Sequence, residues 1–124
     1  MRRLAWTLIL LGAALACERG SSAGILKVNL TTPNSGADRA ILFTVTGPGT
    51  LRGATPRAGL RLFNQPLRMT NKIALTGTLS TGTILAIEVP DVSRASEYTA
   101  TIQQVATPAH QLRALTGYFL TVVP

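Results

Sequence analysis

The sequence predicts an all-β domain, built as a single sandwich of about seven short strands. Apolar and polar residues alternate with a period of two in several short runs, the pattern of a strand with one buried face. Turn-forming residues, mainly Gly, Pro, Asn and Asp, separate these runs at intervals of about 8–12 residues. No stretch shows a helical apolar period with start and stop signals. Charged residues make up only 14% of the chain, which suits strands whose outer faces carry Thr, Ser, Asn and Gln.

The alternation places the expected strands along the chain. They lie at residues 25–30, 40–46, 59–64, 72–79, 83–89, 98–105 and 115–123. In the first of them, Leu26, Val28 and Leu30 alternate with polar residues, so one face is expected to be buried. Pro33 and Gly36 end this strand, because Pro lacks a backbone donor and Gly accepts turn conformations.

The middle of the chain is less regular. Residues 50–58 are basic and show no alternation, so we expect an irregular segment there. The tripeptide Ser-Thr-Gly at 80–82 predicts a hairpin that joins the strands at 72–79 and 83–89. Pro90 breaks the second of these strands.

One local motif bears on the type of sandwich. Residues 95–100 (Ala-Ser-Glu-Tyr-Thr-Ala) resemble the tyrosine corner of immunoglobulin-like domains, in which a Tyr near the start of the sixth strand hydrogen-bonds back across the preceding turn. Ala100 stands where antibody-type domains carry their second cysteine, which fits a disulfide-free relative. The alternative, that Tyr98 is only a core aromatic on an alternating strand, is equally open. The strand count and this resemblance imply an immunoglobulin-like or fibronectin-like sandwich over residues 25–124.

The amino terminus has the features of an export signal. Two arginines follow Met1, and residues 4–15 are uncharged and mostly apolar. This stretch is about 12 residues long, whereas a membrane-spanning helix needs about 20. The segment Ala-Ala-Leu-Ala-Cys at 13–17 resembles a bacterial lipobox, which implies acylation of Cys17 as the new amino terminus. It departs from the usual pattern at Ala14, where Leu is commoner, so a plain secretory signal beside a free cysteine is the alternative.

The lipobox resemblance implies three regions. Residues 1–16 would be a lipoprotein signal peptide, residues 17–24 a flexible tether carrying lipid on Cys17, and residues 25–124 the β-sandwich. Cys17 is the only cysteine, which excludes an intrachain disulfide. Glu18, rather than Asp, follows the cysteine and by the same resemblance permits transfer to an outer membrane. We therefore expect an exported protein of the bacterial cell envelope, lipid-anchored at the outer membrane on its periplasmic or surface face.

The charge of the chain is strongly positive, +7 from 12 basic and 5 acidic residues. No acidic residue occurs between Asp38 and Glu88, so this part of the domain has an uncompensated positive field. Arginine suits binding of phosphate or carboxylate, which suggests an anionic-ligand patch. Its candidate residues are Arg52, Arg57, Arg61, Arg68 and Lys72. The alternative is a solvated surface that keeps the domain soluble.

Catalytic and metal-binding patterns are sparse. The single histidine, His110, follows Pro108 in a loop-like segment, and no Gly-x-Ser-x-Gly motif occurs. Glu88, Asp91 and Glu97 flank one turn but lack the spacing of a calcium loop, so ordinary turn charges are favoured. We predict no catalytic residues, no metal and no cofactor.

These observations favour a non-catalytic binding or scaffolding module, held at the membrane through Cys17. An envelope polysaccharide or protein is the expected partner. Nucleic acid is not expected, because Phe63 is the only aromatic residue near the basic segment. Two alternatives are an accessory or inhibitor subunit of an envelope enzyme, and a secreted soluble β-domain with no lipid anchor.

Overall fold

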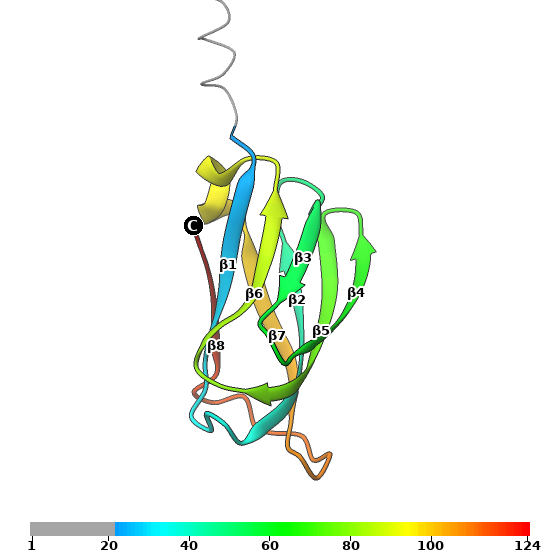
Figure 1. The fold of residues 1–124 in the computed structure, drawn as a ribbon, viewed down its shortest axis with the longest axis vertical. Coiled ribbons are helices and arrows are strands. Elements are labelled where there is room, and N and C mark those ends of the chain that lie inside the picture. The colour runs from blue at the N-terminus through cyan, green and yellow to red at the C-terminus, as the bar shows by residue number, and fades with distance from the viewer. Residues whose placement is uncertain (1–21) are drawn as a thin grey trace, which may run out of the picture.

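The computed structural model describes residues 22–124, which form two four-stranded antiparallel sheets packed face to face (Figure 1). The elements are β1 (Gly24–Thr31), β2 (Asp38–Thr46), β3 (Gly53–Pro56), β4 (Arg61–Leu67), β5 (Thr70–Leu79), β6 (Gly82–Val89), the 3₁₀ helix η1 (Val92–Glu97), β7 (Thr99–Ala106) and β8 (Phe119–Val123). Sheet A has the order β3-β6-β1-β8, and sheet B has the order β4-β5-β2-β7. The predicted all-β, immunoglobulin-like sandwich is confirmed, with eight strands.

The core lies between the two sheets and follows the alternation of the sequence. On β1, Leu26 and Val28 are fully buried, as predicted. On β2, Ile41, Phe43 and Val45 face them from sheet B. Burial of such side chains contributes about 1.5–3 kcal/mol each, so this inner layer is the main source of stability in a chain that cannot form an intrachain disulfide.

The chain crosses between the sheets at every connection except the turn between β4 and β5. The predicted hairpin between residues 72–79 and 83–89 is therefore wrong, because β5 belongs to sheet B and β6 to sheet A. Leu79 at the end of β5 and Ile84 early in β6 are both buried, so residues 80 and 81 carry the chain across one end of the core. The backbone N–H of Thr81 donates to Ser35 Oγ at 2.9 Å, which fixes this crossing to the β1–β2 loop.

Two further elements differ from the prediction. The four residues of β3 fall within the segment expected to be irregular, and they pair antiparallel with β6 at the edge of sheet A. So short a strand gives no readable alternation. Pro66 lies within β4, where it is tolerated because β4 is an edge strand.

The domain begins slightly earlier than predicted. β1 starts at Gly24, and the Ser22 carbonyl accepts a hydrogen bond from the Val92 N–H at 2.8 Å. The last residues of the predicted tether are thus held against η1. The predicted signal peptide (residues 1–16) and Cys17 lie outside the described residues.

Tyr98 does not form a tyrosine corner. Its ring is buried and lies directly over Gly47, and its backbone N–H donates to the Ala95 carbonyl at 3.2 Å. Its hydroxyl makes no hydrogen bond within residues 22–124, whereas a tyrosine corner requires one. Tyr98 is therefore the core aromatic of the alternative interpretation.

The two ends of the sandwich differ in what they present (Figure 1). The proximal end, where β1 begins, carries the β2–β3 loop (residues 47–52), the β4–β5 turn (68–69), η1 and the C-terminus. The distal end carries the loops at 32–37, 80–81 and 107–118.

Candidate binding face

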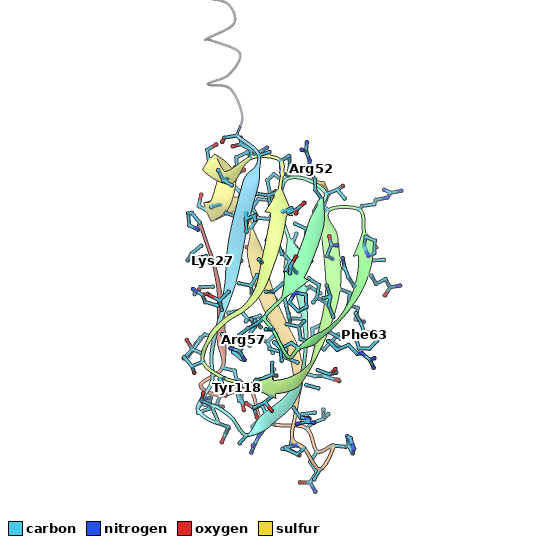
Figure 2. The ribbon with its side chains drawn as sticks, in the orientation of Figure 1. Lys27, Arg52, Arg57, Phe63 and Tyr118 are labelled. Atoms are coloured by element: carbon cyan, nitrogen blue, oxygen red, sulfur yellow. The ribbon has the colours of Figure 1, made fainter. Side chains whose placement is uncertain are left out.

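The outer face of sheet B carries a row of apolar side chains across three strands. Ala74 on β5 pairs in register with Phe63 on β4 and with Leu42 on β2. Phe63 is 53% exposed, and Figure 2 shows it projecting from β4 away from the core. An exposed aromatic in register with apolar neighbours on the next strands makes a continuous apolar surface.

A second row lies beside the first. Ala40 on β2 pairs with Ala106 at the end of β7, and Ala106 also bridges to the exposed Leu112 in the β7–β8 loop. Because these alanines are small, the floor of the sheet is low between Phe63 and Leu112.

Two shallow hollows occupy this floor and share Leu42 and Ala74. The first has a volume of about 300 Å³ and is lined by Leu42, Phe63, Asn64, Gln65, Lys72 and Ala74. The second has a volume of about 190 Å³ and is lined by Ala40, Ile41, Leu42, Ala74, Gln104, Ala106 and Leu112. Together they form what we call the sheet B groove, defined by Ala40, Leu42, Phe63, Ala74, Ala106 and Leu112.

The rim of the sheet B groove is polar and carries positive charge only. Gln65 and Lys72 are register partners beside Phe63, and Gln104 lines the other hollow. Amide and ammonium groups supply hydrogen-bond donors at the edge of an apolar floor. The outer face of sheet A differs, because Lys27 and Glu88 give it one charge of each sign.

The five predicted basic residues do not converge on one site. Arg61 lies on the outer face of sheet B opposite Thr76, four residues along β5 from Lys72 and hence about 13 Å away. Arg57 donates to the backbone carbonyls of Thr83 and Thr78 at 3.5 and 3.2 Å, so it links the two sheets.

The remaining two of these residues lie at the proximal end. Arg68 occupies the β4–β5 turn, and Arg52 lies in the β2–β3 loop (Figure 2). Arg52 and Glu88 line the same hollow, so an acidic residue lies near Arg52. Of the predicted set, only Lys72 lines the sheet B groove.

The three acidic residues considered for calcium have other roles. Asp91 accepts hydrogen bonds from the Ser93 hydroxyl and N–H at 2.6 and 3.0 Å, which lower the pKa of Asp91. Glu97 pairs with Arg94 at 2.6 Å, and the hydrogen bond lowers the pKa of Glu97 and raises that of Arg94. Among residues 22–124, no three His, Cys, Asp or Glu side chains are grouped to hold a metal ion.

A buried polar cluster at the distal end was not predicted. Asp38 is only 1% exposed and accepts hydrogen bonds from Thr32 Oγ1 at 2.8 Å, from the Tyr118 hydroxyl at 2.9 and 3.0 Å, and from Arg113 Nε at 3.0 Å. Asn34 Nδ2 in turn donates to the Tyr118 hydroxyl at 2.9 Å. These bonds tie the β1–β2 loop to the β7–β8 loop.

The sequence contains only a weak signal for this cluster. An irregularity in the pairing of β2 between Asp38 and Ala40 turns Asp38 inward, although it precedes the buried Ile41 by three residues and is out of step with the alternation. Strand alternation alone therefore does not predict that Asp38 is buried.

His110 lies in the β7–β8 loop, where it is exposed and has a positive φ of 63°. Its backbone N–H donates to the Thr107 carbonyl, as expected of a turn residue.

No helix within residues 22–124 is long and apolar enough to cross a membrane. Comparisons with protein-family models, curated proteins and solved structures find no match.

Proposed function

We propose that the chain is a membrane-anchored, non-catalytic binding module of the bacterial cell envelope, which holds a protein or polysaccharide partner in the sheet B groove. The sheet B groove is the observation that carries the proposal. Contiguous exposed apolar surface on a soluble domain is uncommon and marks interaction sites. Here it runs across three strands of sheet B, whereas the exposed apolar residues of sheet A, Ile25 and Phe119, lie at opposite ends of that sheet, paired with Glu88 and Thr31.

The chemistry of the sheet B groove indicates the kind of partner. Phe63 offers a half-exposed aromatic face at one side, and aromatic anchors contribute a large share of binding energy at interfaces. Lys72 and the rim amides favour a partner with carbonyl, hydroxyl or carboxylate oxygens. A neutral or acidic partner is favoured over a basic one.

The anchor is proposed from the lipobox pattern at residues 13–17. Acyl chains on Cys17 would bury enough apolar surface to hold the domain without a spanning helix. Since Ser22 is already bound to η1, only a short piece of chain would separate the lipid from the domain.

Two exposed phenylalanines give a matched test of the binding face. Phe63 lies on the outer face of sheet B, and Phe119, which is 62% exposed, lies on β8 of sheet A. A partner is first captured by a photo-crosslinking residue at position 63 in intact envelopes and identified by mass spectrometry. Phe63→Ala is then expected to weaken its binding by about 2 kcal/mol, roughly thirty-fold in Kd.

Phe119→Ala is the control and should leave the affinity unchanged, with circular dichroism confirming that both variants are folded. Equal affinity of the wild type and Phe63→Ala would contradict the assignment of the sheet B groove as the binding face.

A further inference from the structure

The β4–β5 turn presents apolar side chains and a positive charge together. Leu67 is 49% exposed and Met69 is 51% exposed, on either side of Arg68. No acidic residue lies on β4, on β5 or in the turn itself. Arg68 has a φ of 57°, a left-handed conformation that costs a non-glycine residue about 1 kcal/mol.

This turn lies at the end of the domain from which the chain runs back toward Cys17. The Met69 carbonyl accepts a hydrogen bond from the Gly47 N–H at 3.1 Å, which joins the turn to the β2–β3 loop. Gly49 of that loop lies next to Pro90. Two residues after Pro90, the Val92 N–H donates a hydrogen bond to the Ser22 carbonyl. The turn and the start of β1 thus belong to one continuous surface at the proximal end (Figure 1).

The length of the chain between Cys17 and Ser22 allows a lipid on Cys17 and the β4–β5 turn to reach the same bilayer. From Cys17 to Ser22 the chain spans at most about 17 Å. The β4–β5 turn is displaced from β1 by two strand spacings and one sheet spacing, on the order of 15 Å. A lipid on Cys17 would therefore hold the turn within reach of the same headgroup layer.

We propose that the β4–β5 turn is a second membrane contact, in which Leu67 and Met69 enter the interfacial layer and Arg68 pairs with anionic headgroups. The inference rests on the proposed lipid anchor at Cys17. Apolar side chains beside a cation suit the boundary between headgroups and acyl chains. The contact is weak by itself, but tethering makes it intramolecular, with an effective concentration in the mM range.

The second contact fixes the orientation of the sheet B groove. β4 leads into the turn, and Phe63 lies four residues before Leu67, about 13 Å above the membrane contact. The sheet B groove would then open sideways, just above the headgroups, so that its partner approaches parallel to the bilayer.

Site-specific labelling of the acylated protein in vesicles of phosphatidylethanolamine and phosphatidylglycerol tests this contact. Cys17 is the only cysteine and its sulfur would carry lipid, so one introduced thiol can be labelled selectively. A fluorophore at Met69→Cys is expected to be quenched by lipids with a nitroxide near the headgroup. A fluorophore at Ala109→Cys, in the exposed distal loop, should not be quenched.

A charge reversal provides the second measurement. Arg68→Glu in the Met69→Cys protein is expected to reduce the quenching, whereas Arg61→Glu, at the far end of β4 from the turn, should not.

Two outcomes would overturn the inference, and they are distinguishable. An unquenched label at position 69 on protein that floats with the vesicles would show that the turn is free while the anchor holds. Protein that does not float and whose Cys17 carries no acyl mass would overturn the anchor itself, and the second contact with it.

Discussion

Replacing Asp38 with alanine is expected to lower the free energy of unfolding by about 3–5 kcal/mol, the usual cost of removing one partner from a buried ion pair. The carboxylate accepts hydrogen bonds from Thr32, Tyr118 and Arg113 in a site from which water is largely excluded. Its loss leaves these donors without an acceptor. Urea unfolding followed by far-UV circular dichroism measures the effect.

Two further variants distinguish the loss of hydrogen bonds in the buried cluster from the loss of a negative charge in general. Tyr118→Phe removes only the hydroxyl and should cost about 1–3 kcal/mol, because a hydrogen bond to a charged group is lost. Glu88→Ala removes an exposed acid and should change stability by less than about 0.5 kcal/mol. If Asp38→Ala were no more destabilising than Glu88→Ala, Asp38 would not join the distal loops.

Gly47→Ala is expected to destabilise the domain by about 2 kcal/mol through a single steric clash. A Cβ at this position would lie 2.2 Å from Cδ1 and 2.3 Å from Cε1 of Tyr98, so the ring would have to leave its buried site. Gly47 does not have a positive φ, so the backbone conformation itself is allowed to alanine. Gly53→Ala is the matched control, since its nearest contact is the end of the flexible Glu88 side chain.

A double-mutant cycle with Tyr98→Ala tests this explanation. Once the ring is absent, Gly47→Ala should cost almost nothing, so the two changes should be strongly non-additive. Additive effects in urea unfolding would contradict the contact between the ring and Gly47.

Strands such as β1 and β2 could be predicted because their inner residues alternate over five or more positions, whereas the four residues of β3 could not. Leu26 and Val28 on β1, and Phe43 on β2, are examples whose burial follows from sequence period alone. The crossing after Leu79 could not be predicted in this way, because a turn tripeptide such as Ser-Thr-Gly serves equally within one sheet or between two.

The candidate site depends on register, which the sequence does not contain. Phe63, Ala74 and Leu42 are far apart along the chain and form one row only through the pairing of β4, β5 and β2. The basic residues show the converse, because Arg57 and Arg61 are close in sequence but have separate roles: Arg57 links the sheets and Arg61 lies on an outer face.

Intact-mass measurement of the protein extracted from bacterial envelopes tests the lipid anchor most directly. The expected species begins at Cys17 and carries the added mass of acyl chains, with no trace of residues 1–16. A chain that begins at another residue, or an unmodified Cys17, would contradict the membrane-anchored module.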